Sequence, residues 1–114
     1  MQTFGKLGEE KAAAFLKGKG YEVLAQNHRY KKSEIDLICQ KDGLLIFVEV
    51  KTRSSRAFGN PETFVSENQR MAIIRAAEAY MDETNWGGDL RFDIIAIVSR
   101  GGEEEITHLE DAFY

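Results

Sequence analysis

The sequence predicts a single domain of the α/β class, in which one helix precedes three strands and a second helix precedes a further strand. The chain has 114 residues, of which 43% are hydrophobic and one is a proline, enough to bury one core without metal or disulfide bridges. Apolar residues recur at helical spacing near the N-terminus and again after residue 66. Between these stretches an Asp-Gly dipeptide separates two apolar runs, which is a strong signal for a β-hairpin.

The predicted elements follow one another without a repeat, a low-complexity tract or a linker. We predict a helix and then three strands, over residues 3–19, 21–30, 34–40 and 44–51. Ser66 and Gln69 form a capping box that begins a second helix, which runs to Tyr80. After a turn at 86–88, residues 90–98 form the next strand, and residues 105–109 are expected to add a short edge strand.

Composition limits the classes of function. The formal net charge of −4 is the opposite of what a nucleic-acid-binding protein usually carries. The single cysteine, Cys39, cannot form an internal disulfide, which suits a reducing compartment. The N-terminus lacks a basic start leading into an apolar run, and no apolar run is long enough to span a membrane. We therefore expect a cytoplasmic protein that does not act at a membrane.

The first predicted helix places an acidic side chain on its packing face. Glu9 falls on the same helical stripe as Gly5, Ala12, Ala13 and Leu16, most of which are small enough to allow close approach. A carboxylate on a packing face needs a partner. Two interpretations stay open for Glu9: a bond to an arginine or to the backbone, and a role at a metal ion.

The hairpin turn sets a register that can be compared with the side chains. If Asp42 and Gly43 are the loop residues, Lys41 pairs with Leu44 and the residue numbers of every cross-strand pair sum to 85. One face then pairs only apolar residues: Ile35 with Val50, Leu37 with Val48 and Cys39 with Ile46. The other face pairs Ile38 with Phe47, Asp36 with Glu49 and Glu34 with Lys51. A shift by one residue would destroy this match.

The predicted pairing of Asp36 with Glu49 brings two like charges together. At about 5 Å and an effective dielectric constant near 20, two carboxylates repel by roughly 3 kcal/mol, whereas a favourable cross-strand pair returns only about 0.2 to 1 kcal/mol. Mg²⁺ or Mn²⁺ would offset the repulsion, because these hard cations take carboxylate oxygens as ligands. A solvated pair, or one carboxyl that titrates, explains the two acids as well.

Two basic runs are predicted to meet beside this acidic pair. One covers residues 29–32 and the other residues 51–56, and the hairpin register brings Lys32 opposite Arg53. A positive rim around a metal-binding centre suits a phosphodiester, because Lys and Arg bind phosphates while the cation lies at the scissile group. We therefore expect DNA as partner. The predicted contacts are Arg29, Lys31, Lys32, Arg53 and Arg56, with Gln69 and Arg70 at the start of the second helix.

The segments Glu34-Ile35-Asp36-Leu37-Ile38 and Phe47-Val48-Glu49-Val50-Lys51 resemble the signature of the PD-(D/E)XK nuclease superfamily. More closely, the chain resembles the YraN-like group of uncharacterised bacterial proteins, which are relatives of the archaeal Holliday-junction resolvases. The matching motifs are Gly5-Lys6-Leu7-Gly8-Glu9, Asn27-His28-Arg29, Phe58-Gly59 and Arg91-Phe92-Asp93. Two positions depart from that group's pattern: Ser33 stands where it usually has glycine and Asn68 where it usually has lysine.

The resemblance implies a restriction-endonuclease-like, three-layer fold, a mixed sheet with helices on both faces, and a metal-dependent nuclease. It implies that Asp36 and Glu49 bind Mg²⁺ or Mn²⁺, that the backbone carbonyl of Val50 joins them, and that Glu9 is a partner through water. Lys51 is implied to orient the attacking water or to stabilise the transition state. Branched DNA is implied as a substrate, which would suit a homodimer with two sites.

Two other classes of function remain open from the sequence. A catalytically silent nucleic-acid-binding or assembly module would keep the fold without the chemistry, and the acidic net charge supports it. A hydrolase that acts on a free nucleotide would use the same metal. The joint presence of Asp36, Glu49 and Lys51 argues against the first alternative, and the extended basic rim argues against the second.

Overall fold

Two helices and five strands make up the described residues, 4–54 and 64–114, of this computed structural model. Their order agrees with the prediction, including the edge strand at the C-terminal end. The elements are α1 (Phe4–Gly18), β1 (Glu22–Tyr30), β2 (Ser33–Lys41), β3 (Leu44–Arg53), α2 (Glu67–Thr84), β4 (Asp89–Arg100) and β5 (Glu103–Leu109). Neither helix is long and apolar enough to cross a membrane.

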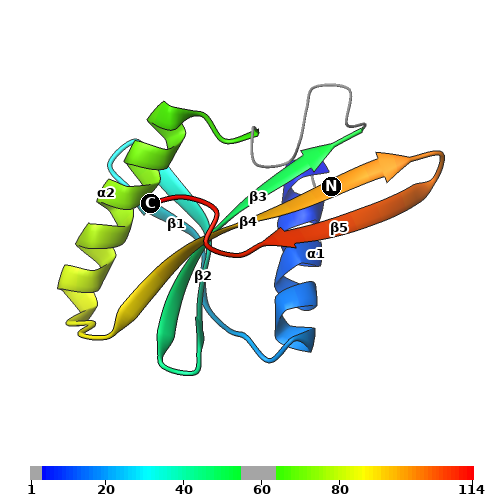
Figure 1. The fold of residues 1–114 in the computed structure, drawn as a ribbon. Helices are drawn as coiled ribbons and strands as arrows, with labels where there is room; N and C mark the ends of the chain where they lie inside the picture. Colours follow the sequence, from blue (N-terminus) through cyan, green and yellow to red (C-terminus); the bar gives the residue numbers. More distant parts are fainter. Residues whose placement is uncertain (1–3, 55–63) are drawn as a thin grey trace.

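The five strands form one mixed sheet in the order β1-β2-β3-β4-β5. Strands β3 and β4 are parallel, because α2 carries the chain back between them, and the other neighbours are antiparallel. The sheet lies between α1 and α2 (Figure 1). This arrangement confirms the predicted fold class, an α/β three-layer core of the restriction-endonuclease type.

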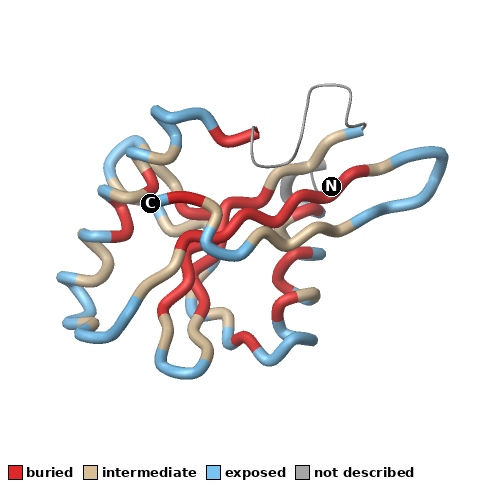
Figure 2. Tube along the Cα trace, in the orientation of Figure 1, coloured by how far each residue is buried: buried red, intermediate tan, exposed pale blue. Residues whose placement is uncertain are grey.

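The core consists of two apolar clusters, one under each helix. Ala12, Ala13 and Leu16 of α1 pack on one face of the sheet, as their helical stripe predicts. Ile73, Ala76 and Ala77 of α2 pack on the other face. Buried residues accordingly follow the centre of the sheet and the inner side of each helix (Figure 2).

The predicted hairpin register is correct near the turn and wrong beyond it. Strands β2 and β3 pair from Lys41 with Leu44 to Leu37 with Val48, as expected, and their ladder ends there. The expected pairs beyond that point are Ile35 with Val50, Asp36 with Glu49, Glu34 with Lys51, Ser33 with Thr52 and Lys32 with Arg53, and none of them forms between these described strands. The prediction placed Ile35 and Leu37 on the same face, but Ile35 packs in the cluster under α2 and Leu37 in the cluster under α1.

Local contacts determine where α2 begins and ends, and a glycine allows α1 to pack closely on the sheet. The predicted capping box begins α2: Gln69 N–H donates to Ser66 Oγ at 3.2 Å, and Ser66 N–H donates to Gln69 Oε1 at 2.9 Å. Asn85 ends the helix in the left-handed conformation, with φ of 54°. In α1, a Cβ on Gly8 would lie 2.3 Å from Thr52 Oγ1, so glycine is what lets this helix approach β3 closely.

Candidate metal centre and nucleic-acid surface

Asp36 lies where β2 and β3 separate. The β2–β3 ladder, followed from the turn, ends at the pair Leu37–Val48. Beyond it, the backbone N–H of Val50 donates to Asp36 Oδ2 at 2.8 Å. Glu9 reaches Asp36 from α1, on one face of the sheet, while Glu49 lines a hollow together with residues of α2, on the other face. The side chain of Asp36 lies between the two strands, and it is therefore close to both Glu9 and Glu49.

The carboxyl groups of Glu49 and Asp36 are close enough to interact, and both residues are only 9% exposed. Burial, followed by the bond to Glu49 and its charge, raises the pKa of Asp36 to about 9. The N–H of Val50 and the charge of Lys51 act in the opposite direction but do not cancel these effects. The structure thus brings Asp36, Glu49 and Lys51 together by a route other than the expected ladder.

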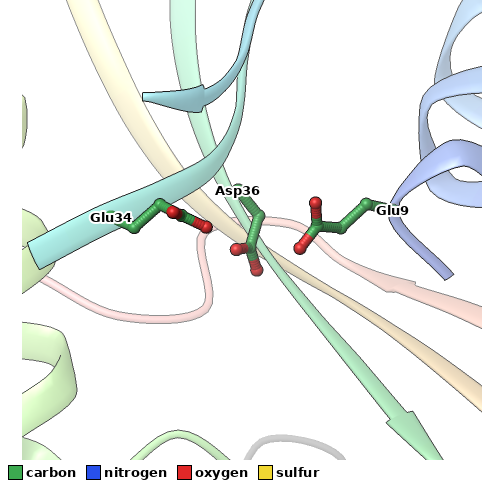
Figure 3. A group of neighbouring side chains, drawn as sticks. All are labelled: Glu9, Glu34 and Asp36. Carbon is green, nitrogen blue, oxygen red and sulfur yellow. The ribbon is translucent and has the colours of Figure 1, made fainter. Parts of the chain in front are cut away.

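Glu9 and Glu34 complete the acidic group around Asp36. One carboxylate oxygen from each of these three residues lies within 4.8 Å of the others. Glu9 extends from α1 toward Asp36, and Glu34 approaches from β2 (Figure 3). Glu34 was not among the predicted site residues, because the hairpin register paired it with Lys51; in the structure Glu34 contacts Arg29 at 3.4 Å. Its separation of two residues from Asp36 was the available signal, because such residues share a face of a strand.

Asn27 links the outer two acids. Its Nδ2 donates to Glu9 Oε1 and, at 3.1 Å, to Glu34 Oε1. Asn27 lies between the β1–β2 pairs Gln26–Leu37 and His28–Ile35, and it has a φ of 52°. At this point β2 changes the face that it presents, since Leu37 packs under α1 and Ile35 packs under α2. The sequence analysis quoted Asn27 in a motif and gave it no role.

The donor set suits a hard divalent cation. Glu9, Glu34, Asp36 and Glu49 offer carboxylate oxygens, which Mg²⁺ and Mn²⁺ prefer. Burial and Glu49 raise the pKa of Asp36 and so favour its neutral form, whereas a bound cation would favour the carboxylate. Val50 contributes its N–H to Asp36, and its carbonyl as a ligand stays a prediction, as do the metal-binding roles of the carboxylates.

Two neighbouring hollows open beside the acidic group. The first, of about 250 Å³, is lined by Glu34, Glu49, Lys32, Ser33, Gln69, Ala72 and Ile73. The second, of about 330 Å³, shares Lys32 and Ser33 with it and is completed by Tyr30, Lys31 and Arg75. Carboxylates therefore line one hollow, whereas the charged side chains of the other are all cations. Arg75 of α2 was not among the predicted nucleic-acid contacts, because it lies outside the two basic runs of the sequence.

The expected nucleic-acid contacts divide into three groups. Lys31 and Lys32 line the second hollow, and the ammonium of Lys31 lies 5.3 Å from the centre of the Tyr30 ring. Four others have structural partners: Arg29 contacts Glu34, Arg53 lies over the Phe64 ring, Gln69 caps α2, and Arg70 donates to the Val65 carbonyl. Arg56 lies outside the described residues.

A second buried acid, Asp93 on β4, has an arginine and a histidine as hydrogen-bond partners. Its side chain is fully buried, receives two bonds of 2.8 Å from Arg91 and one of 2.7 Å from His108, and accepts the N–H of Asp111 at 3.1 Å. Burial alone would raise the pKa of Asp93, but the bonds from His108 and Arg91 lower it overall. This network ties β5 and the C-terminal segment to β4.

Comparison with known proteins shows the family to which this chain is similar. A family model described as "Uncharacterised protein family UPF0102" matches residues 8–97. A UPF0102 protein of Flavobacterium johnsoniae is 45% identical over 114 aligned residues, covering 96% of this chain and 93% of the relative. A UPF0102 protein of Christiangramia forsetii is 44% identical, covering 96% and 92%. One from Syntrophomonas wolfei is 39% identical and covers 98% of both chains.

Proposed function

This chain belongs to the uncharacterised protein family UPF0102, and we propose that it is a metal-dependent nuclease that hydrolyses phosphodiester bonds in DNA. The observation that carries the proposal is the buried Asp36, whose pKa is raised by burial and by Glu49, with Lys51 close enough to oppose that shift. A structural ion pair would lower the pKa of a buried aspartate, as Asp93 demonstrates. These surroundings of Asp36 suit a ligand of a cation.

In this proposal Asp36 and Glu49 hold Mg²⁺ or Mn²⁺, with Glu9 and Glu34 close by. When bound, such a cation lowers the pKa of a coordinated water and neutralises charge that builds up on the phosphate. Lys51 stands two residues after Glu49 on the same strand, and in this proposal its ammonium would orient the attacking water or stabilise the transition state. Asp36 also accepts the N–H of Val50, which fixes its carboxylate for this task.

The second hollow supplies the path for the substrate. Its cations Lys31, Lys32 and Arg75 would bind phosphates that flank the scissile one, because the two hollows share Lys32 and Ser33. Arg29 and Arg53 stay proposed contacts at the rim, where a phosphate would compete with their present partners. We include in the proposal a cytoplasmic location, branched DNA as a preferred form, and a homodimer that places two sites on it.

A cleavage assay tests the proposal. Purified protein is incubated with Mg²⁺ or Mn²⁺ and linear, single-stranded, flap or four-way DNA, beside Asp36→Asn. We expect metal-dependent cleavage by the parent and none by the variant. If the parent binds DNA but cleaves no form with either metal, the chain is a binding or assembly module, an alternative that its net charge of −4 favours.

The substrate path has a test of its own, which does not need cleavage. Arg75→Ala should weaken DNA binding and reduce the slope of log affinity against log salt by about 1, the value for one lost phosphate contact. Arg100→Ala is the matched control, because Arg100 lies at the β4–β5 turn, away from both hollows. Equal slopes for the two variants would move the DNA path away from the second hollow.

A further inference from the structure

Asn27 lies in the middle of β1 with a backbone conformation that strands avoid. Its φ is 52°, although its neighbours Gln26 and His28 keep their partners on β2. The left-handed region is unfavourable for residues with a Cβ, and asparagine is among the few that tolerate it. The ladder also has a register shift between Val23 and Ala25, but Asn27 has paired neighbours on both sides, so its backbone conformation meets a local demand other than pairing.

The side chain of Asn27 shows what that demand is. An asparagine amide nitrogen has two hydrogens, and here one is donated to Glu9 Oε1 and the other to Glu34 Oε1. These acids come from α1 and β2, and they are the two that join Asp36 in the acidic group. Because both hydrogens are engaged, the two carboxylates are fixed relative to each other across three elements of the fold.

The donor is neutral, which matters for the chemistry of the group. A lysine or arginine at this place would also hold two carboxylates, but its positive charge would compensate them and weaken their attraction for a cation. An amide orients the acids and leaves their negative charge in place. Each ionised carboxylate has about four acceptor positions, so the oxygens that bond Asn27 keep the capacity to bind a cation.

We propose that Asn27 is a positioning residue of the metal centre, which holds Glu9 and Glu34 beside Asp36 through its two amide hydrogens and thereby sets the affinity for the cation. This inference rests on the proposed function, since it concerns the same metal. The left-handed backbone is what aims the amide at both acids. Asn27 therefore acts on the cation through other residues and not as a ligand.

Asn27→Gly isolates the side chain, because glycine adopts a positive φ without strain. We expect this variant to bind Mn²⁺ about 10 to 100 times more weakly than the parent in a calorimetric titration, the usual effect of losing a partner that orients metal ligands. The electron paramagnetic resonance spectrum of bound Mn²⁺ should change as well. Asn85→Gly is the matched control, since Asn85 has a φ of 54° at the end of α2 and lies outside the acidic group. Its Mn²⁺ affinity should equal that of the parent.

The outcomes separate this inference from the function on which it rests. If the parent binds no Mn²⁺, the proposed function fails. If the parent and a folded Asn27→Gly bind Mn²⁺ equally, only the role of Asn27 fails. Should Asn27→Gly not fold, nuclear magnetic resonance of the parent decides: the two Nδ2 hydrogens of Asn27 should exchange slowly and shift when Mg²⁺ is added. Signals of an ordinary exposed amide would overturn the proposal.

Discussion

Asp36 and Asp93 are both buried aspartates in the same sheet, yet their surroundings shift their pKa values in opposite directions. Asp93 is bonded to Arg91 and His108, which lower its pKa against the effect of burial. Burial and the neighbouring acid Glu49 raise the pKa of Asp36 to about 9, and the charge of Lys51 does not offset them. Asp93 has an arginine and a hydrogen-bond donor from His108 beside it, whereas among the described residues Asp36 has a second acid as its neighbour, an arrangement that a cation from solvent would stabilise.

The difference teaches that burial of an acid does not by itself indicate a functional site. A buried ion pair is part of the architecture, and removing one partner leaves the other without compensation. A buried group of like charges destabilises the fold unless something binds there. The two regions should therefore respond to the same substitution, Asp→Asn, with changes of opposite sign in the free energy of unfolding.

The largest expected effect belongs to Asp93→Asn. It removes the negative partner of Arg91 and His108, and breaking a buried pair costs about 3 to 5 kcal/mol. We expect a loss near 3 kcal/mol, because the Arg91 side chain remains 20% exposed. Urea unfolding in metal-free buffer measures it. A loss below about 1 kcal/mol would mean that the Asp93 network contributes little to the fold.

The same acid predicts a response to pH. The pKa of Asp93 in the folded protein lies below its ordinary value of 3.8. Its contribution to stability is therefore fully present above that value and is lost as the pH falls through the lower, folded pKa. Asp93→Asn should lose this part of the acid dependence, which unfolding curves between neutral pH and the acid limit of the folded state would show.

The next effect concerns Lys51, whose positive charge lowers the pKa of Asp36. This charge is too weak to offset burial and Glu49, whereas the bonds from Arg91 and His108 lower the pKa of Asp93 overall. Lys51→Ala should reduce cleavage by about 100-fold, or roughly 2.7 kcal/mol of barrier, while Mn²⁺ affinity stays nearly unchanged and DNA affinity falls only slightly. Lys17→Ala, an exposed residue of α1, is the control. Equal cleavage by Lys51→Ala and the parent would remove the catalytic role of Lys51.

A smaller effect of opposite sign to that of Asp93→Asn is expected for Asp36→Asn. At neutral pH the folded protein must bind a proton at Asp36, whose pKa is about 9, whereas the unfolded chain with its ordinary pKa of 3.8 does not. Asparagine needs no proton and its amide oxygen can still accept the N–H of Val50, so we expect a gain in stability of about 2 kcal/mol in the presence of a chelator. Mn²⁺ should stabilise the parent and not the variant. Destabilisation of metal-free Asp36→Asn would contradict the comparison.

The sequence predicted the helices and strands better than it predicted the surroundings of Asp36 and Asp93. Periodicity, the capping box at Ser66 and the turn at Asp42-Gly43 predicted every element, because each is encoded by neighbours in sequence. The register failed at Asp36, where a side chain replaces a backbone partner and Asn27 leaves the alternation of the strand. The alternation of side chains along a strand assumes a regular backbone. It therefore predicts neither the bond from Val50 to Asp36 nor the left-handed conformation of Asn27.

The partners of the two acids show the same limit. Arg91 and Asp93 stand two residues apart on one strand, so their pairing was open to prediction. His108 reaches Asp93 only through the pairing of β4 with β5, which the sequence analysis did not align. Glu9 was placed on a packing face from its helical stripe alone, but its proximity to Glu34 depends on how closely α1 lies against β3.

That approach gives the last and smallest prediction, which concerns Gly8. In the interior of a helix, Gly→Ala normally stabilises by about 1 kcal/mol. Here the added Cβ would lie 2.3 Å from Thr52 Oγ1, too close for any real contact, and overpacking costs about 1 to 3 kcal/mol. We therefore expect Gly8→Ala to destabilise by about 1 kcal/mol and, because α1 must move, to weaken Mn²⁺ binding.

In a Thr52→Ala background the clash is absent, so the same change should become neutral or stabilising and leave Mn²⁺ affinity unchanged. A double-mutant cycle on unfolding and on Mn²⁺ titration measures this coupling. If Gly8→Ala stabilises the parent background, α1 is free to shift away from β3, and the close packing of Gly8 on Thr52 does not hold Glu9 in the acidic group.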